Sequence, residues 1–311
     1  MRWRPRGSPI SLAFTLFVLV SLFSTAPSTA AAQTPNAGVS ADDLVRAAVQ
    51  HQLDTSNDPS IKHAFRSRKE TAHGSQTKLY AETTESIVGL VIANNDQPIP
   101  PQQLQGEMAH LNQLAHNPDD LGRKHRQERE DADRSLRIVR ALPDAFLYQY
   151  DGTEMGRDGV GKAGDELVRL KFRPNPKYVP PSRIEQMLPG MQGYLLIDKS
   201  ANRLARIDGT LFRDVTFGWG ILGHLDKGGN FLVDQGDCGD GTWEIRHMRL
   251  DFTGKIMMFK GVSIKSEEVL SNFRRIPGDT TFAQGVEMLK SEEARLRAER
   301  ESTTSARRQS H

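Results

Sequence analysis

The clearest pattern in the chain is an alternation of apolar and polar positions over residues 193–235. Two sets of alternate residues fall on its two sides: Ala205, Ile207, Gly209 and Leu211 on one, and Leu204, Arg206, Asp208 and Thr210 on the other. A period of two is typical of an antiparallel strand with one buried face. Turn-forming residues at 199–202, 212–214 and 226–230 divide the stretch, which predicts a meander of short strands.

Strand patterns continue on both sides of this meander. They cover residues 64–69, 77–84, 85–93, 144–150, 166–172, 242–252 and 255–266. We expect the last two to be joined by a turn at Thr253 and Gly254. In the final strand, Val262 and Ile264 lie on one face, while Met257 and Phe259 lie on the other. Apolar side chains on both faces predict that this strand is covered on both sides.

Helical patterns occupy three regions. Residues 41–53 have apolar positions at helical spacing, with Ser40 as the expected N-cap. Residues 102–141 are strongly polar, with a break at 116–119, and 282–298 form the last helix. The sequence therefore predicts an α+β fold in which a large curved antiparallel sheet, an open half-barrel, is covered by N-terminal, middle and C-terminal helices.

The N-terminus has the three parts of a secretory signal peptide. Basic residues precede an apolar run at 10–23, and small residues follow up to Ala32. The apolar run is shorter than the about 20 residues of a membrane span. We expect cleavage after Ala32, a periplasmic or extracellular location and no membrane span in the mature chain. An uncleaved N-terminal anchor is the alternative.

These boundaries give the expected domain organisation. A signal peptide (1–32) and a disordered linker (33–40) precede a single half-barrel domain (41–290). A charged helical insertion (99–142) interrupts that domain, and a helix end with a disordered tail (291–311) follows it.

Removal of the signal changes the charge balance. The whole chain has 41 basic and 39 acidic side chains, and Arg2, Arg4 and Arg6 leave with the signal, so 38 basic side chains remain against 39 acidic ones. This balance gives no case for nucleic acid as a partner. The lone Cys238 excludes an intramolecular disulfide, so the core must hold the exported chain together.

Three groups of residues have the types that could form a phosphate, metal or catalytic site. Residues 156–162 have the pattern G-x-x-x-x-G-K, and residues 159–164 have the pattern G-x-G-x-x-G. Both phosphate-binding motifs need a helix after the loop, but a strand pattern follows here. We therefore expect a flexible hairpin loop and no bound nucleotide. Asp234, Asp237 and Asp240 form an acidic turn beside Cys238, which we interpret as solvated, with calcium as the alternative. The histidines show no metal-ligand spacing, and we expect no cofactor, no metal and no catalytic residues.

The most unusual peptide is 217–223, in which glycines flank a tryptophan. Such a peptide forms either a packed barrel corner or the lip of an apolar cavity. The candidate ligand-lining residues are Phe217, Trp219, Ile221, Leu222, Met257 and Phe259.

The combination of an N-terminal helix and a long meander interrupted by helices resembles the periplasmic lipoprotein-carrier group (LolA and LolB). The peptides RPNPKYVPPSR, RLARIDGTL and DVTFGWGILGHLDKGG also resemble stretches of uncharacterised exported bacterial proteins. The carrier resemblance covers roughly residues 41–290 and implies a half-barrel whose concave face holds acyl chains, with helices as a lid. The charged segment 102–140 departs from that pattern.

Three functions follow as hypotheses. The first is an exported binding protein for an apolar ligand, either an acyl chain or a lipoprotein. The second is an envelope structural or interaction protein that docks a partner through residues 102–140. The third is a hydrolase that uses Cys238 with His224 or His247.

Overall fold

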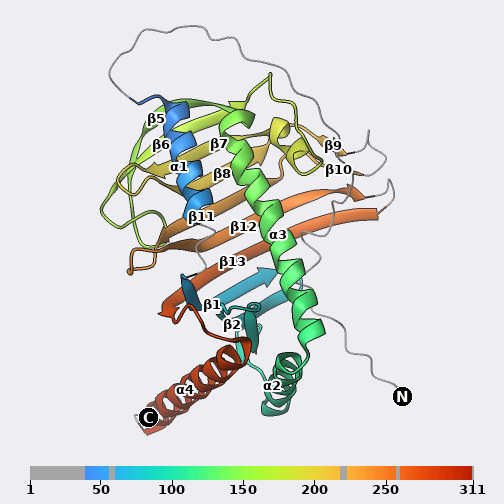
Figure 1. Cartoon of the computed structure of the whole chain (residues 1–311), viewed down its shortest axis with the longest axis vertical. Coiled ribbons are helices and arrows are strands. Elements are labelled where there is room, and N and C mark those ends of the chain that lie inside the picture. Colours follow the sequence, from blue (N-terminus) through green and yellow to red (C-terminus); the bar gives the residue numbers. More distant parts are fainter. Residues whose placement is uncertain (1–38, 56–59, 218–222, 257–259, 310–311) are drawn as a thin grey trace.

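The computed structural model describes residues 39–55, 60–217, 223–256 and 260–309. One antiparallel sheet organises these residues, and helices lie against it (Figure 1). The helices are α1 (Ala41–Thr55), α2 (Pro101–Ala115), α3 (Pro118–Ala145) and α4 (Phe282–Gln309), with a short 3-10 helix, η2 (Glu185–Gly190). The strands are β1 (Lys62–Thr71), β2 (Gly74–Ala81), β3 (Val88–Asn94), β4 (Gln97–Pro98), β5 (Phe146–Met155), β6 (Glu166–Pro174), β7 (Met191–Asp198), β8 (Arg203–Leu211), β9 (Val215–Phe217), β10 (Gly223–Leu225), β11 (Asn230–Asp237), β12 (Trp243–Ile256) and β13 (Lys260–Ile276).

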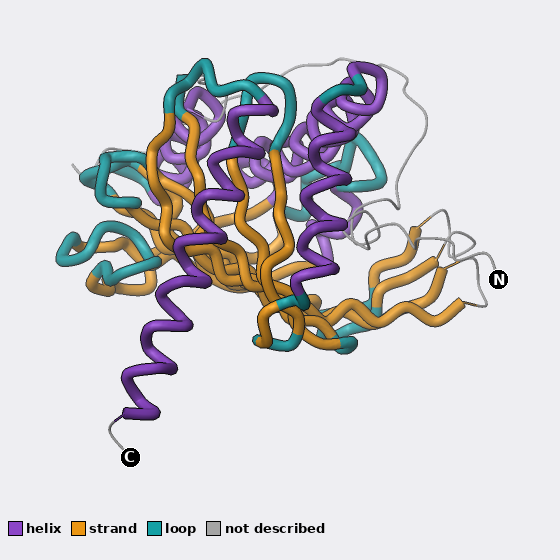
Figure 2. The backbone as a smooth tube through the Cα atoms, turned by 90° about the horizontal axis from the view of Figure 1, so that it is seen from below, coloured by secondary structure: helices purple, strands orange, loops and turns teal. Residues whose placement is uncertain are grey.

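The sheet is open, which confirms the expected fold class. In the described residues its 13 strands follow the order β4-β3-β2-β1-β13-β12-β11-β8-β7-β6-β5, and β9 and β10 branch from β12. The strands at the two ends, β4 and β5, do not pair with each other. Seen from below, the strands form a curved layer from which α4 projects (Figure 2).

The long β12–β13 hairpin lies at the centre of this order. The turn expected at Thr253 and Gly254 is wrong, because both residues lie inside β12 and pair with Ser263 and Val262. The strand continues past Gly254 because this glycine accommodates the neighbouring β10. A Cβ atom there would lie 2.1 Å from the carbonyl oxygen of His224.

The helices divide between the two faces of the sheet. We call the face that carries α1 and α3 the inner face (Figure 1). Buried residues of α1 and of the end of α3 pack there against β5–β8 in the larger core, which includes Val45, Leu142, Leu170 and Leu195. A second core, which includes Leu79, Leu90 and Phe282, joins β2 and β3 to α2 and α4.

Local caps explain where two of the helices begin. Ser40 accepts a hydrogen bond from the Asp43 amide through its hydroxyl (3.1 Å), as expected for an N-cap. Asn117 caps α3 in the same way, since its side chain accepts from the Asp120 amide (3.2 Å). The helix break predicted at 116–119 is confirmed, and α4 is longer than the predicted 282–298, because it reaches Gln309 and includes most of the expected tail.

A β-bulge changes the predicted alternation in β8. Ile197 pairs with Leu204 and Leu196 pairs with Arg206, so Ala205 is the extra residue. Leu204 therefore belongs to the inner core together with Ile207 and Leu211, whereas Ala205 packs with Leu196 on the opposite face. The prediction that Ala205 shares a face with Ile207 is wrong for this reason.

The outer face of the sheet carries a ladder of polar side chains. The ladder takes one residue from each of seven neighbouring strands: Glu154, Arg169, Tyr194, Arg206, Asp234, His247 and Glu267. The Arg169 guanidinium stacks 3.8 Å from the centroid of the Tyr194 ring, and Arg206 forms a two-pronged ion pair with Asp234. The same face also carries a small apolar cluster of Val160, Leu167, Leu196 and Ala205, so the outer face is mixed where the inner face holds the larger core.

The glycine-rich loop between β5 and β6 packs against this outer face. The strand expected after it is confirmed. The middle of the expected flexible loop is held against the sheet, because Val160 is 4% exposed and the Gly161 amide donates to the Gln235 carbonyl (2.8 Å). Gly161 has a φ of +71°, and a Cβ atom on Gly236 would lie 3.0 Å from the Gly161 oxygen. The loop therefore needs glycine on both sides of this contact.

Candidate ligand-binding face

The central hairpin presents an apolar surface on the inner face. We define the inner apolar patch by five residues on β12 and β13: Met248, Leu250, Phe252, Val262 and Ile264. The strand pairing aligns them across the hairpin, since Phe252 pairs with Ile264 and Gly254 with Val262. Leu250 and Ile264 are half-buried and pack against the core that also contains α1, so the patch lies on the side of the helices.

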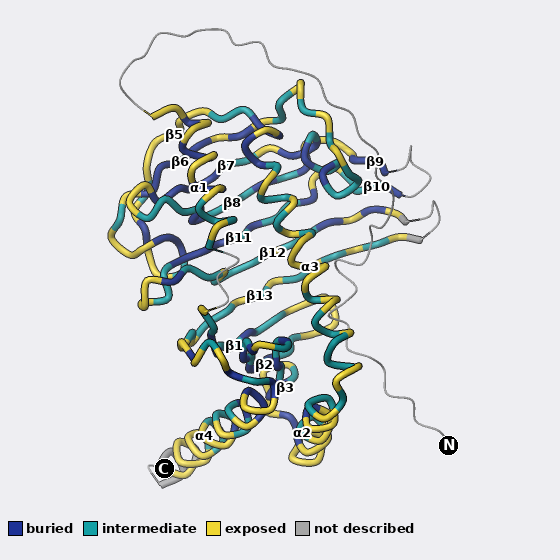
Figure 3. The backbone as a smooth tube through the Cα atoms, in the orientation of Figure 1, coloured by how far each residue is buried: buried dark blue, intermediate teal, exposed yellow. Residues whose placement is uncertain are grey.

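The same hairpin is uncovered on its outer face. Residues 263, 265, 267 and 269 of β13 are exposed, whereas residues 262, 264, 266, 268 and 270 are half-buried (Figure 3). The expected cover on both sides is therefore wrong for the described part of this strand. The outer side chains are mostly polar, and α4 packs only at the β2–β3 end of the sheet.

Helix α3 crosses in front of the hairpin and is anchored at its two ends (Figure 1). At its beginning, Lys124 donates to the Ile87 carbonyl (2.6 Å) and Glu128 accepts from the Ser86 hydroxyl (2.8 Å). At its end, Leu142 is buried in the inner core, with Ile138 and Val139 packed around it. The half-buried Arg134 in the middle of the helix forms its ion pairs with Asp131 and Glu130 of the same helix.

Most of the predicted ligand-lining residues lie outside the described residues: Trp219, Ile221, Leu222, Met257 and Phe259. Phe217 is described, is 6% exposed and belongs to the inner core. The described residues that border the two predicted segments are neighbours in the sheet, because Gly223 pairs with Phe217 on one side and with Ile256 on the other. Their role in binding stays a prediction.

A polar group that the sequence did not reveal borders the inner apolar patch. Glu268 follows the patch along β13, accepts a hydrogen bond from the Ser67 hydroxyl (2.6 Å) and pairs with the Lys69 ammonium (3.4 Å). Next to it, Tyr80 stacks on Phe65 with ring centroids 5.2 Å apart, and Lys78 lies two residues from Tyr80 on the same strand face. The inner face therefore changes from apolar on β12 and β13 to basic and aromatic on β1 and β2.

Another unpredicted cluster surrounds His63, which is 1% exposed. Its Nε2 lies 3.3 Å from Asp240 Oδ2 and 3.1 Å from the Thr242 hydroxyl, and its Nδ1 lies 3.2 Å from Glu244 Oε1. The Glu244 carboxylate raises the pKa of His63 above its ordinary value, although burial acts in the opposite direction. The cluster ties the start of β1 to the β11–β12 turn, and its burial makes it a structural element.

Two aspartates of the predicted acidic turn, Asp234 and Asp240, make separate contacts with basic side chains. Asp234 is buried against Arg206 and His247, while Asp240 faces His63, so the expectation of a solvated turn is wrong for Asp234. In the described residues, no group of His, Cys, Asp and Glu side chains has an arrangement that could hold a metal ion. Burial raises the pKa of Cys238 to about 12, which keeps its thiol protonated at neutral pH.

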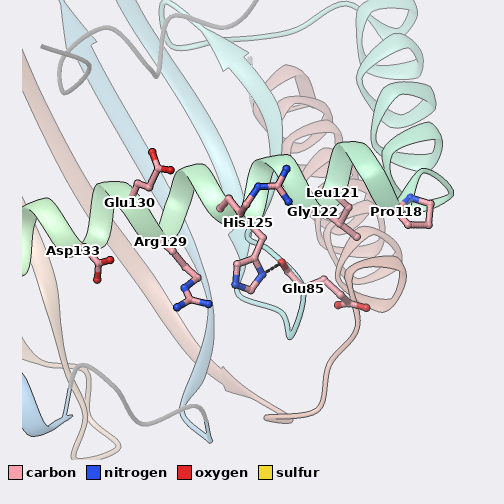
Figure 4. A pocket seen from close by; sticks show the side chains of 9 residues that line it. Glu85, Pro118, Leu121, Gly122, His125, Arg129, Glu130 and Asp133 are labelled. Carbon is pink, nitrogen blue, oxygen red and sulfur yellow. Dashed lines mark hydrogen bonds between the residues drawn. The ribbon is translucent and has the colours of Figure 1, made fainter. Parts of the chain in front are cut away.

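Two grooves open at the surface. The first, of about 530 Å³, follows α3 beside Glu85 and is lined mainly by charged side chains, among them Arg126, Arg129 and Asp133. Figure 4 shows Arg129 and His125 projecting from one side of the helix, with a ring nitrogen of His125 bonded to the Glu85 carbonyl. The second, of about 630 Å³, lies between the outer part of α4 and β1–β4.

Comparison with known proteins gives similarity only at the level of solved structures. No family model matches the sequence, and no curated protein matches it. The chain is similar to a "putative outer membrane lipoprotein-sorting protein domain" from Vibrio parahaemolyticus, with 13% identity over 79% of this chain and 99% of that chain and a TM-score of 0.27. It is also similar to a DUF1329 family protein from Desulfovibrio piger, with 13% identity over 75% of this chain and 93% of that chain and a TM-score of 0.27.

A TM-score of 0.27 is too low to transfer a ligand or a partner to this chain. Among the described helices, none has both the length and the hydropathy that a membrane crossing requires.

Proposed function

We propose that this protein is an exported binding protein that holds an acyl chain, free or attached to a lipoprotein, on the inner apolar patch. The observation that supports this function is the one-sided exposure of the central hairpin. Its inner side chains in the patch are apolar and half-buried or buried beneath α3, while its outer side chains are mostly polar and exposed. The signal-peptide pattern at residues 1–32 supports export to the periplasm or beyond.

An acyl chain on this surface gains free energy from burial alone. Each buried methylene contributes about 0.8 kcal/mol, so partial burial of one chain is sufficient for binding. This mode of binding uses no catalytic group and no cofactor. N-terminal sequencing of the exported protein checks the proposed cleavage after Ala32.

The decisive test is binding of a fluorescent fatty acid to the delipidated mature protein. Two substitutions on β13 provide a matched pair: Ile264→Asn places an amide on the inner apolar patch, and Val269→Asn places one on the exposed outer face. We expect Ile264→Asn to weaken binding about tenfold, since it removes contacts equivalent to one or two buried methylenes. Val269→Asn should bind like the unchanged protein, and equal affinity of all three proteins would refute the proposed surface.

Mass spectrometry of the lipid extract from purified protein provides an independent check. Co-purified fatty acids, phospholipids or lipoprotein acyl chains would support the function. An empty extract together with no binding of the fluorescent fatty acid would reject it.

The groove along α3 favours a second function, docking of an envelope protein partner. Arg126 and Arg129 of α3 line this groove together with Glu85. Both arginines belong to the charged segment predicted to bind a partner. We expect Arg126→Glu with Arg129→Glu to abolish capture of such a partner from an envelope extract. Arg123→Glu is the control, because Arg123 is exposed on the same helix and does not line the groove. Capture that survives the double substitution would exclude this surface.

A further inference from the structure

Lys78 lies on the inner face between two groups of side chains. The aromatic pair Phe65 and Tyr80 is on one side, and Glu268 with its partners Ser67 and Lys69 is on the other. On β2 it pairs with Ser67 of β1, and Ser67 in turn pairs with Leu270 of β13. Tyr80 is two residues along the same strand and therefore points to the same face. Three strand spacings, about 14 Å in all, separate β2 from the strand that carries Met248.

The charges that act on Lys78 come from the elements around the inner face. Glu107 lies on α2, Glu268 on β13, Lys69 on β1 and Lys124 on α3, and all four affect the Lys78 ammonium electrostatically. Lys78 therefore lies on the inner face, within electrostatic reach of α2 and α3.

Lys78 has no close partner in the part of the chain that the structure describes. It forms no hydrogen bond there, and no carboxylate oxygen lies within 4.0 Å of its ammonium. Of the two carboxylates that act on Lys78, Glu268 is held by Ser67 and Lys69, while Glu107 of α2 lies beyond ion-pair distance of the ammonium. Burial lowers the pKa of Lys78, because desolvation of the half-buried ammonium is not offset by a bound carboxylate.

The phenol of Tyr80 is a second polar group on the inner face near Lys78. Tyr80 lies beside Lys78, and burial raises its pKa, so its phenol keeps its proton and remains a hydrogen-bond donor. A half-buried ammonium without a partner and a neighbouring phenol suit an anionic oxygen ligand, either a carboxylate or a phosphate.

We propose that Lys78, assisted by Tyr80, binds the anionic head group of an acyl ligand whose chain runs over Phe65 and Leu270 to the inner apolar patch. This inference rests on the proposed function, and it adds the chemical class of the ligand: an amphiphile with a negatively charged head. The ligand neutralises the desolvated ammonium, so the site selects anionic lipids over neutral lipids of the same chain length.

The test compares two probes that differ only in head-group charge: a fatty acid labelled at its chain end with a fluorophore, and the methyl ester of the same molecule. We expect the delipidated protein to bind the acid about tenfold more tightly than the ester, which is the scale of one charge-assisted hydrogen bond. Lys78→Met should remove this preference by weakening the acid alone, and Lys78→Arg should retain it. Lys199→Met is the control, since Lys199 lies in an exposed turn.

The outcomes separate this inference from the proposed function. If the unchanged protein binds acid and ester equally, or if Lys78→Met keeps the preference for the acid, the inference fails while acyl binding stands. If neither probe binds, both fail. Competition against the bound acid by unlabelled palmitate or by short-chain phosphatidylglycerol then shows whether the head group is a carboxylate or a phosphate, and failure of both competitors also overturns the inference.

Discussion

The ion pair between Arg206 and Asp234 allows a sharp test of how the outer face is stabilised. Its two contacts, Nε to Oδ1 at 2.5 Å and Nη2 to Oδ2 at 2.9 Å, join β8 to β11. The Asp234 side chain is 5% exposed and that of Arg206 14%. Substitution of Arg206 by Leu removes both contacts and leaves the buried carboxylate beside the His247 ring, whose Nδ1 lies 3.4 Å from Asp234 Oδ2.

We expect Arg206→Leu to reduce the free energy of unfolding by about 3–5 kcal/mol, the usual cost of an uncompensated buried charge. For a chain of this size, that loss corresponds to a fall in Tm of roughly 6–20 °C. Urea and thermal unfolding followed by circular dichroism measure both quantities.

Arg46→Leu is the matched control. Arg46 also pairs with a carboxylate, that of Asp144 at 3.2 Å, but the two side chains are 59% and 67% exposed. An exposed pair contributes about 1 kcal/mol or less, so this variant should unfold almost like the unchanged protein. Equal losses for the two variants would refute the role of burial, as would a double substitution of Arg206 and Asp234 by Leu that is less stable than Arg206→Leu alone.

Two further predictions concern pH and backbone space. Since the pKa of His63 is raised in the folded state, its stabilising effect is complete below a pH of about 6.5 and is lost as the pH rises through the folded-state pKa. The unfolding free energy should fall by up to about 1.4 kcal/mol per pH unit in that window, and His63→Gln should reduce this slope; a slope unchanged in the variant would exclude His63 as its source. Gly193→Ala should strongly destabilise the fold, because the new Cβ atom would lie 1.9 Å from the Asp208 carbonyl oxygen. Gly106→Ala in α2 meets open space and should stabilise the fold by about 0.5–1 kcal/mol. Thermal unfolding that ranks the two variants in the opposite order would contradict this.

The sequence predicted the elements well where local chemistry decides them. The cap at Ser40 begins a helix, the break at 116–119 separates two helices, and the turn residues at 199–202 end a strand, because each of these features depends on residues only a few positions apart. The open antiparallel sheet followed from the period of the apolar positions, which is also a local property.

The wrong predictions concern features that depend on contacts between residues far apart in the sequence. Ala205 changes face because a bulge in the β7–β8 ladder adds one residue, and Gly254 continues its strand because β10 packs beside it. The buried position of Asp234 depends on Arg206, 28 residues earlier, and the environment of His63 depends on residues about 180 positions later. No local pattern carries such information, so neither cluster could be found before the strands were paired.

The composition of α3 gives a physical reason why the inner apolar patch is only half-buried. An ordinary surface helix packs an apolar stripe onto its sheet and fills the space beneath it. In α3, apolar anchoring lies at the two ends, around Leu121 and Leu142, and the middle of the helix satisfies its own charges, as in the Arg134–Asp131 pair. A helix of this kind gains little from closing onto Leu250 and Ile264, so the surface below it stays accessible to an apolar ligand. The unusually polar segment that departs from the carrier resemblance is therefore compatible with a carrier, because most side chains of the patch stay partly exposed.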